Sequence, residues 1–334
     1  MPELRKDPII GRWVIVATER ARRPGNIVES LDQGIRGKKE DCAYCQEQKT
    51  ILFSKKIPSR GKTPSSEIRV ISYAKSFFKT DVNVQRHFHG LYEIVKGFGM
   101  DELVIETPEH MTYTPDFSVD HLTALLNVYA ARIKTIVKNP DIQHVLVYKN
   151  YGALAGSQMT GHSCSRVVGM PVIPFHVKEK LSGAQDYFKK QRRCVYCDMI
   201  KQEIAAKTRV ILENKNFVAL TPFAARFLFE VWILPKKHSC DFTDSSQSVQ
   251  KDLAAILKSL LQKVREGLGD PAYNFVIQTA PIGMREENNI KNYYHWHIEI
   301  LPRLTRVAGF EKGTGFYINS IPPEATAEFL RGVP

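Results

Sequence analysis

The stretch that organises the chain reads Asn150-Tyr-Gly-Ala-Leu-Ala-Gly-Ser-Gln-Met-Thr-Gly-His162-Ser-Cys164-Ser-Arg166. It follows an apolar run at residues 145–148, which is typical of a buried strand. Its small residues allow a backbone to approach a ligand closely, and it ends with an imidazole and a thiol two positions apart. Because residues two apart on an extended chain face the same side, the stretch predicts a strand that presents both side chains to one site.

A second pair of this kind, His295 and His297, closes another apolar segment near the C-terminus. The features before the two pairs also share one order: a Cys-x-x-Cys pair, a strand followed by proline and histidine, a serine-capped helix and a further strand. The serine caps are Ser118 and Ser246. This agreement predicts a duplicated protein with domains at residues 1–182 and 183–334.

The composition is that of an ordinary globular protein: of 334 residues, 43% are hydrophobic and 25% are charged. No apolar run approaches the roughly 20 residues that span a bilayer, and the first residues lack the apolar core of a signal peptide. We therefore expect a cytoplasmic protein without a membrane partner. The formal net charge of +12 is spread along the chain, which favours anionic metabolites over nucleic acid as partners.

Four of the six cysteines form two Cys-x-x-Cys pairs, which in cytosolic proteins more often bind metal or serve redox exchange than form structural disulfides. Together with the histidines that follow, they predict two closed sets of two thiolates and two imidazoles, a tetrahedral arrangement that suits structural Zn²⁺. The alternatives are unligated thiols or redox-active pairs. The predicted ligands are Cys42, Cys45, His110 and His162 in the first set, and Cys194, Cys197, His238 and His295 in the second.

The sequence leaves two possible roles open for several residues. Cys164 and His297 each lie two positions beyond a predicted metal ligand. Cys164 is either a functional group or a small buried hydrophobe, and His297 is either functional or a hydrogen-bonded core histidine. The arginine cluster that contains Arg20 and Arg23 is either a solvated surface or a clamp for phosphate. Residues 26–66 are interpreted as loop-rich.

The sequence resembles the galactose-1-phosphate uridylyltransferase family of the histidine-triad superfamily over nearly its whole length. The resemblance rests on RKDPIIGRWV at residues 5–14, ERARRP at 19–24, NYG at 150–152, CVYCD at 194–198 and HWHIEILPR at 295–303. It implies an α+β fold of two tandem histidine-triad-like domains, each a mostly antiparallel sheet with a packed helix. It also implies an enzyme that exchanges nucleotidyl groups between a nucleotide sugar and a phosphate or sugar 1-phosphate. The second Cys-x-x-Cys set resembles the ADP-glucose phosphorylase branch.

The resemblance also implies roles for individual residues. Contacts with phosphate or sugar are expected from Arg20, Arg23 and Asn150, contacts with the nucleotide phosphate from Gly156 and Ser157, and a contact with the sugar from Asn319. The expected ligands are a UDP- or ADP-linked sugar, or another nucleoside diphosphate derivative, and a phosphate or sugar phosphate. A homodimer is compatible with the sequence, which does not decide the oligomeric state.

One departure from the family changes the expected chemistry. Where the family has His-x-His-x-Gln, whose second histidine attacks the α-phosphate, this chain has His162-Ser-Cys164-Ser-Arg166. Cys164 and Arg166 are therefore the predicted catalytic residues, although an alternative alignment makes His162 the attacking group. Three mechanisms stay open: a covalent intermediate at Cys164, direct transfer in a ternary complex with charge stabilisation by Arg166, and nucleotide binding without catalysis.

Overall fold

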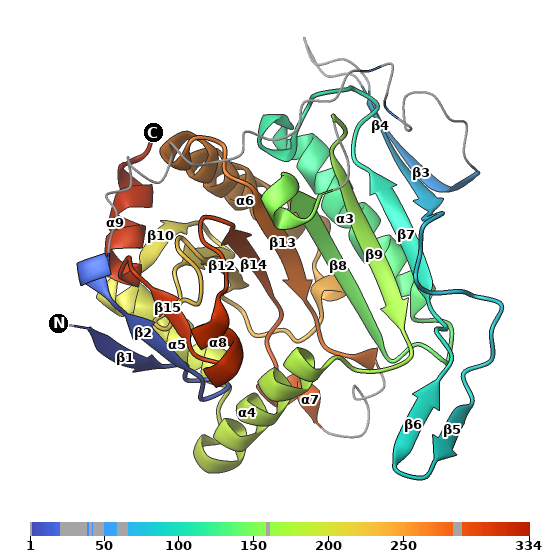
Figure 1. Ribbon diagram of the computed structural model, residues 1–334. Helices are drawn as coiled ribbons and strands as arrows, with labels where there is room; N and C mark the ends of the chain where they lie inside the picture. Colours follow the sequence, from blue (N-terminus) through green and yellow to red (C-terminus); the bar gives the residue numbers. More distant parts are fainter. Residues whose placement is uncertain are drawn as a thin grey trace.

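Ten strands of the described residues form one antiparallel sheet, which carries the candidate site (Figure 1). The computed structural model describes residues 2–20, 39, 42, 50–58, 66–157, 161–282 and 289–334. The strand order across the sheet is β10-β11-β12-β14-β13-β8-β9-β7-β4-β3. The bounds are β3 Ile51–Ile57, β4 Ser66–Ser72, β7 Met100–Ile105, β8 His144–Tyr151, β9 Cys164–Met170, β10 Val210–Glu213, β11 Phe217–Leu220, β12 Val231–Pro235, β13 Tyr273–Gln278 and β14 His297–Pro302.

The sheet consists of two similar halves that meet at β8 and β13. From this seam outward, the first half runs β8-β9-β7-β4-β3 and the second runs β13-β14-β12-β11-β10. One long helix stands at the same place in each half, α3 Val119–Ile136 in the first and α6 Gln247–Leu268 in the second. The seam itself is antiparallel, with Asn274 opposite Asn150. The predicted duplication of a mostly antiparallel sheet with a packed helix is therefore confirmed.

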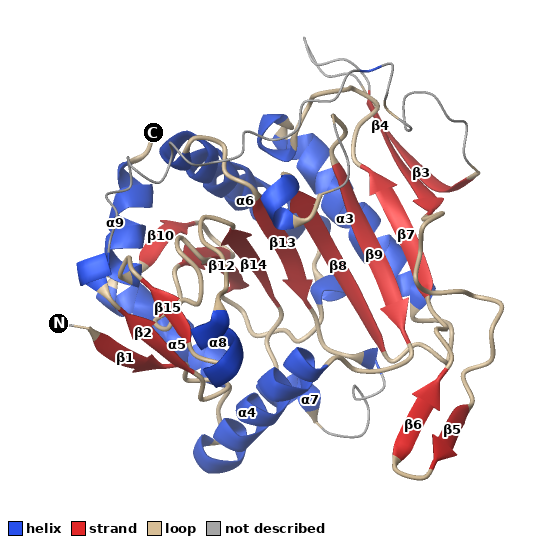
Figure 2. Ribbon diagram, in the orientation of Figure 1, coloured by secondary structure: helices blue, strands red, loops and turns tan. Residues whose placement is uncertain are grey.

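The two long helices pack against each other and cover one face of the sheet (Figure 2). Ser118 caps α3 as predicted, because its hydroxyl accepts a hydrogen bond from the His121 amide at 3.1 Å. Apolar residues recur along both helices at three- and four-residue steps, so each helix presents one apolar face. These faces pack on alternate strand residues, including Val104, Val167 and Ile298, to form the main core.

The opposite face of the sheet has different surroundings in the two halves. On the second half, α4 Phe175–Gln191 and α5 Val195–Ala206 pack against the strands, and Leu181 and Tyr196 join Trp232 in a separate apolar cluster. On the first half, a cavity opens on this face beside β8 and β9. The packing of α4 on one half only therefore positions the candidate site in the other.

The remaining elements lie around this framework. A three-stranded sheet joins β1 Glu3–Lys6 and β2 Trp13–Val16 to β15 Tyr317–Asn319, and β5 Arg86–His89 and β6 Tyr92–Val95 form a projecting hairpin (Figure 1). The predicted domain boundary at residues 182 and 183 falls inside α4, and the domain bounds stay a prediction. The short elements are η1 Thr18–Arg20, η4 Thr114–Asp116, η5 Ala153–Ala155, η6 Phe242–Asp244, α7 Ile290–Tyr293, α8 Gly309–Thr314 and α9 Pro323–Gly332.

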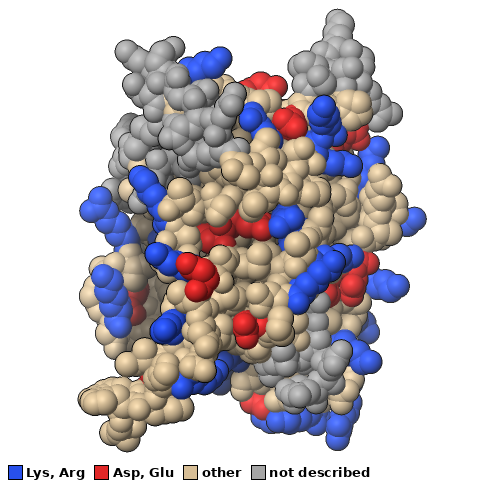
Figure 3. All heavy atoms as spheres, turned by 90° about the vertical axis from the view of Figure 1, so that its right-hand side faces the viewer, with Lys and Arg blue, Asp and Glu red and all other residues tan. Residues whose placement is uncertain are grey.

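Strand β3 and helix α5 are among the elements that were not predicted from the sequence. Strand β3 lies within the segment that was interpreted as loop-rich, where it forms the exposed outer edge of the large sheet. Helix α5 begins directly after Cys194. Among the described residues, no helix has the length and apolar character needed to cross a bilayer. On the face shown in Figure 3, Lys and Arg side chains are scattered among acidic ones, in agreement with the dispersed charge of the sequence.

Gly183 of α4 lies directly against the N-terminal loop, so we expect a methyl group at this position to destabilise the protein. A Cβ atom placed there lies 1.7 Å from the Ile9 carbonyl oxygen. Asp7 holds this loop, since its carboxylate accepts hydrogen bonds from the amides of Ile9 and Ile10 at 2.8 and 3.2 Å. Gly183→Ala should lower the free energy of unfolding by about 1–3 kcal/mol, as overpacking does, in a urea titration.

Gly313→Ala in α8 is the matched control. A Cβ atom at Gly313 meets nothing within 4 Å, and alanine favours a helix over glycine by about 1 kcal/mol. This variant should keep or slightly raise the stability. Equal stability of the two variants would contradict the close packing of α4 on the N-terminal loop.

Candidate active site and metal centres

A cavity of about 530 Å³ lies beside β8 and β9 on the face of the sheet opposite α3 and α6. Its size is within the range of about 300–1,000 Å³ that is usual for small-molecule sites. Its lining combines aromatic rings with amide, hydroxyl and charged groups, which together suit a planar ligand that carries anionic oxygens. The aromatic residues are Tyr73, Phe77, Tyr113, Tyr148 and Tyr151, and the polar ones include Lys75, Lys149, Asn150, Ser157, Ser163, Arg166 and Asp270.

The turn after β8 brings three predicted phosphate-binding residues together. Asn150, Gly156 and Ser157 all line the cavity. Gly152 and Gly156 have positive φ angles of 80° and 84°, and a Cβ atom at Gly152 would lie 2.6 Å from the Ala272 Cβ. Glycine is therefore required for this turn to close against the second half of the protein.

Cys164 lies at the wall of the cavity and is largely buried. It is the first residue of β9, only 8% exposed, and its side chain packs with Leu103 and Ile105 in a small apolar cluster. Burial raises the pKa of the Cys164 thiol, although the nearby Lys149 acts in the opposite direction. The neutral thiol is therefore the favoured form, and its packing corresponds to the interpretation of Cys164 as a small buried hydrophobe.

Arg166 also lines the cavity, but its charge already has a partner. Its Nε donates to the Asp101 carboxylate at 3.0 Å, and its Nη2 contacts the second oxygen of the same group. The guanidinium lies over the Tyr73 ring, 4.1 Å from the centroid, and near Phe77. The Asp101 side chain is only 1% exposed, so the pair is a bidentate ion pair at the cavity wall.

A buried ion pair behind the cavity was not predicted from the sequence. The Lys149 Nζ lies 2.8 Å from a Glu106 carboxylate oxygen, 2.8 Å from the Ser163 Oγ and 3.2 Å from the Cys164 carbonyl oxygen. Burial alone would raise the pKa of Glu106, but the Lys149 ammonium and the hydrogen bond from Ser163 outweigh it and lower the pKa. The available signal was a charged residue inside each of two apolar strand segments, because such a charge needs a partner.

The second predicted metal set is assembled in the structure. Ligand atoms of Cys194, Cys197, His238 and His295 all lie within 4.8 Å of one another. The Cys197 Sγ lies 3.2 Å from the His238 Nδ1 and 3.6 Å from the His295 Nδ1. A hydrogen bond from the Cys194 thiol, with contributions from the neighbouring His238 and His295, outweighs burial and lowers the pKa of Cys197 to about 3, which favours the thiolate that a metal ion binds.

Both imidazoles of this set are oriented by backbone carbonyl groups. The Nε2 of His238 lies 2.8 Å from the Lys291 oxygen, and the Nε2 of His295 lies 2.8 Å from the Pro235 oxygen. Because a carbonyl oxygen only accepts, each Nε2 carries the proton and each Nδ1 lone pair faces the thiolates. Two sulfur and two nitrogen donors in this arrangement fit a tetrahedral zinc ion.

Three ligands of the first predicted set also meet. Ligand atoms of Cys42, His110 and His162 lie within 4.8 Å of one another, and the fourth predicted ligand, Cys45, lies outside the described residues. Burial, with a contribution from His110, lowers the pKa of His162, which favours the neutral imidazole that binds metal. A Cβ atom at Gly161 would lie 2.2 Å from the His110 ring, so glycine is required for the two segments to meet.

The structure does not bring every predicted substrate residue to the cavity. Arg23 and the side chain of Arg20 lie outside the described residues. Asn319 is 1% exposed and is not among the residues that line the cavity. Its Nδ2 donates to the Ala225 oxygen at 3.0 Å, and its Oδ1 accepts from the Ile321 amide at 3.0 Å. In this chain Asn319 therefore links β15 to the segment before β12.

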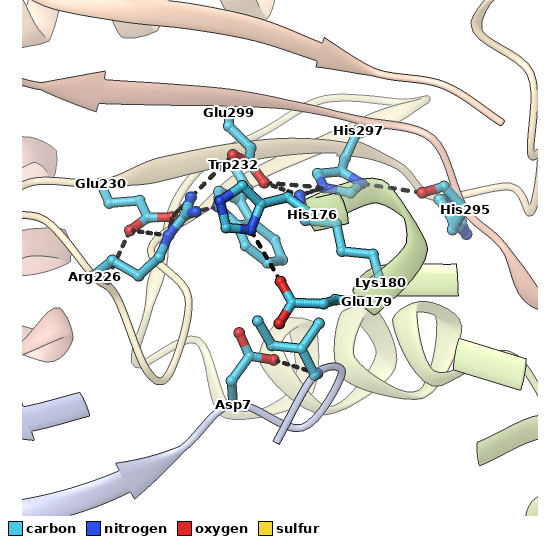
Figure 4. A network of polar contacts seen from close by, with 11 residues as sticks. Asp7, His176, Glu179, Lys180, Arg226, Glu230, Trp232, His295, His297 and Glu299 are labelled. Carbon is cyan, nitrogen blue, oxygen red and sulfur yellow. Dashed lines mark hydrogen bonds and ion pairs between the residues drawn. The ribbon is translucent and has the colours of Figure 1, made fainter. Parts of the chain in front are cut away.

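His297 occupies the place in the second half that Cys164 occupies in the first, and it is a hydrogen-bonded core histidine (Figure 4). Its Nδ1 donates to the His295 oxygen at 3.0 Å, and its Nε2 lies 3.2 Å from the Lys180 Nζ. Burial, with a contribution from Lys180, lowers the pKa of His297 to about 4. Glu299 accepts hydrogen bonds from both Lys180 and Arg226, so a network of paired charges fills this half of the face.

Comparisons with known proteins place this chain in a family. A family model described as galactose-1-phosphate uridyl transferase, C-terminal domain, matches residues 180–316, and one for the N-terminal domain of DUF4931, a domain of unknown function, matches residues 88–173. ADP-glucose phosphorylase of Arabidopsis thaliana is 36% identical over 336 residues, which cover 99% of this chain and 93% of that protein. Galactose-1-phosphate uridylyltransferase of Thermotoga maritima is 25% identical over 344 residues, covering 99% and 98%. The chain belongs to the galactose-1-phosphate uridylyltransferase family.

Solved structures agree with membership in the uridylyltransferase family. The crystal structure of an ADP-glucose phosphorylase from Arabidopsis thaliana with bound ADP-glucose superposes with a TM-score of 0.81 at 35% identity, and the match covers 100% of both chains. A structure of uridylyltransferase shares the fold, with a TM-score of 0.75 at 23% identity over 100% of this chain and 98% of that one. The sequence resemblance to this family of nucleotidyltransferases, and the α+β fold that it implied, are confirmed.

The Asp101–Arg166 pair predicts how this family member responds when the glutamine of the usual motif is restored. Arg166→Gln alone leaves the buried Asp101 carboxylate without its partner. We expect the free energy of unfolding to fall by about 3 kcal/mol, because an uncompensated buried charge is costly. Arg166→Gln combined with Asp101→Asn should recover most of this loss in a denaturant titration. A double variant as unstable as the single one would show that the ion pair does not account for the effect.

Proposed function

We propose that this family member exchanges a nucleoside monophosphate between a nucleotide sugar and a phosphate or sugar 1-phosphate acceptor, in the cavity beside β8 and β9. One observation carries the proposal: the chain matches, over 99% of its length, an ADP-glucose phosphorylase whose crystal structure contains ADP-glucose. The cavity, whose lining suits such a ligand, supports it. UDP- and ADP-linked sugars are the candidate donors. Aromatic rings of the cavity can stack on a base, while amide and ammonium groups can bind phosphoryl oxygens.

The geometry favours direct transfer between bound donor and bound acceptor over a covalent intermediate at Cys164. In direct transfer, an acceptor oxygen forms a bond to the α-phosphorus while the bond from that phosphorus to the bridging oxygen breaks, and the sugar 1-phosphate leaves. A covalent route needs a thiolate, since the protonated thiol is not the nucleophile. The buried Cys164 thiol, with its raised pKa, is poorly suited to that role.

In this mechanism the chain acts mainly by holding both reactants in line. Asn150, Gly156 and Ser157 are the groups proposed to bind phosphoryl oxygens, since they surround one part of the cavity. Arg166 contributes positive charge at the wall, reduced by its pairing with Asp101. Substrate contacts by Arg20 and Arg23 stay predictions. The sugar contact of Asn319 also stays a prediction; its side chain is hydrogen-bonded to neighbouring backbone groups.

We also propose zinc as the metal of both ligand sets, with a structural role. The donor types, the closed four-ligand arrangement of the second set and the imidazole orientations all support this assignment. In the first set, zinc would tie Cys42 to the segments that carry His110 and His162. Because His162 stands two residues before Cys164, the first zinc ion would stabilise one border of the cavity.

The cytoplasm stays the predicted location, and a homodimer is compatible with the sequence, which does not decide the oligomeric state. Light scattering on the purified protein measures the oligomeric state. A molar mass close to the 38.0 kDa of one chain would exclude the dimer under those conditions.

Direct transfer predicts a specific kinetic pattern. With ADP-glucose or UDP-glucose as donor and phosphate as acceptor, initial-rate plots should intersect, and α-labelled nucleotide should not remain on the protein. Cys164→Ser should keep turnover within about threefold, because Cys164 does not bond to phosphorus in this mechanism. Parallel plots, together with retained label that is lost in Cys164→Ser, would instead support the covalent route.

A variant that restores the His-x-His-x-Gln motif of the family distinguishes an enzyme from a protein that only binds nucleotides. Cys164→His with Arg166→Gln and Asp101→Asn places an imidazole at the wall without leaving a buried charge unpaired. If the cavity holds the α-phosphate there, this variant should retain label. Nucleotide binding without turnover in the parent protein, and without label in the variant, would support the non-catalytic alternative.

Metal content tests the two zinc sets separately. Elemental analysis should find two zinc ions per chain in the parent protein, and one in His238→Ala or His110→Ala. Each loss should lower the melting temperature, because metal binding contributes to folding free energy. His176→Ala is the control, since its side chain is 76% exposed on α4 and belongs to neither set. Protein that folds without metal and contains a reducible disulfide would favour the redox interpretation of the cysteine pairs.

A further inference from the structure

Two asparagines face each other across the seam between the halves, and only one of them lines the cavity. Asn150 on β8 and Asn274 on β13 are direct partners in the antiparallel pair. The Asn274 Nδ2 donates to the Asn150 Oδ1 at 2.8 Å and to the Ala155 carbonyl oxygen at 2.9 Å. Asn150 borders the cavity, whereas Asn274 is not among its lining residues.

The Ala155 carbonyl determines which way both amides point. A backbone carbonyl oxygen only accepts hydrogen bonds, so the group of Asn274 that faces it must be the NH₂ group. The same NH₂ group then faces Asn150, which must present its oxygen in return. The Asn150 NH₂ group is thereby turned to the other side, where its contact with the Gly156 oxygen is long, at 3.4 Å.

We propose that Asn274 is a positioning residue for ligand binding: it orients the Asn150 amide so that an N–H donor, and not an oxygen, meets the ligand in the cavity. A donor at this place selects for an acceptor oxygen, such as a phosphoryl oxygen of the nucleotide. This inference rests on the proposed function for the identity of the ligand, but the orientation itself follows from hydrogen bonds within the protein.

The same side chain also holds the turn that carries two other ligand-binding candidates. Ala155 is the last residue of η5, and Gly156 and Ser157 follow it directly on the cavity wall. By binding the Ala155 oxygen, Asn274 connects this turn to β13. A residue of the second half therefore sets the position of this turn in the first half. It also determines which group of the Asn150 amide, NH₂ or oxygen, faces the cavity.

The first experiment tests the orientation without any ligand. Asn150→Asp replaces the amide oxygen that accepts from Asn274 by a carboxylate oxygen, which also accepts, so the hydrogen bond from Asn274 is kept. Asn274→Asp instead places a carboxylate against two acceptors, the Ala155 oxygen and the Asn150 Oδ1. We expect Asn274→Asp to lower the melting temperature by about 2–6 °C and Asn150→Asp to lower it less. The reverse order would mean that Asn150 is the donor, and would overturn the proposal.

The second experiment measures the effect on binding, by calorimetry with ADP-glucose and UDP-glucose. In Asn274→Asp, the dissociation constant of the nucleotide sugar that binds the parent protein should rise by about 10- to 100-fold. The reason is that the Asn150 amide turns its oxygen toward the ligand in this variant. The matched control is Asn127→Asp, which makes the same change on α3, on the opposite side of the sheet. It should leave the dissociation constant within about twofold.

A double-mutant cycle separates positioning from a general loss of structure. If Asn274 acts mainly through Asn150, then Asn274→Asp should weaken binding at least about threefold less in the Asn150→Ala background than in the parent protein, and the remaining weakening reflects the turn at Ala155. Undiminished weakening in the Asn150→Ala background would show that Asn274 acts independently, and would overturn the proposal.

Failure of the proposed function is distinguishable from failure of this inference. If the parent protein binds neither nucleotide sugar, the proposed function fails. The order of the two melting temperatures still decides whether Asn274 orients Asn150.

Discussion

The hydrogen-bonded pairing of β8 with β13 is the constraint on which the rest of the structure depends. It joins two copies of one repeat into a single sheet, so that α3 and α6 pack together on one face. Separated halves would expose two strand edges with unpaired backbone groups, which is unfavourable in water and promotes association. Because the seam passes beside the cavity, Gly269 and Asp270 of the second half line a site whose other walls belong to the first. The candidate site is therefore a product of both halves.

Duplication created two related places on the same face of the sheet, and packing made them different. Cys164 begins β9 and His297 begins β14, which are corresponding strands. The first place borders a cavity, whereas Lys180 of α4 and the Trp232 ring close over the imidazole in the second. The charges buried there are closely paired, since an unpaired charge in the interior costs several kcal/mol. Among the described residues, the network therefore fills its space in the second half, whereas a cavity large enough for a ligand borders the first.

The altered motif is accommodated by residues outside it. The charge of Arg166 is matched by Asp101 on the neighbouring strand β7, and its guanidinium plane lies on Tyr73. Cys164 is small enough to pack beside Leu103 in an apolar cluster. Both contacts follow from the strand pairing of β7 with β9, which places these side chains next to one another. A thiol in apolar surroundings and an arginine with its own carboxylate form a wall for the cavity, and this arrangement suits positioning better than nucleophilic attack.

The sequence by itself determined the elements whose signals are local or repeated. Helical periodicity predicted α3 and α6, and the recurring Cys-x-x-Cys and histidine positions predicted ligand sets whose described members do meet in the structure. The sequence did not indicate β3. This strand lies at an exposed edge of the sheet, and without a fully buried face its residues show no clear alternation of apolar and polar side chains. The contacts of Lys149 with Glu106 and of Asn150 with Asn274 were decided only by tertiary structure. Each joins segments distant in the chain through strand register, and no local pattern encodes a register. For the same reason only the packing of α4 decided which copy of the repeat stays open.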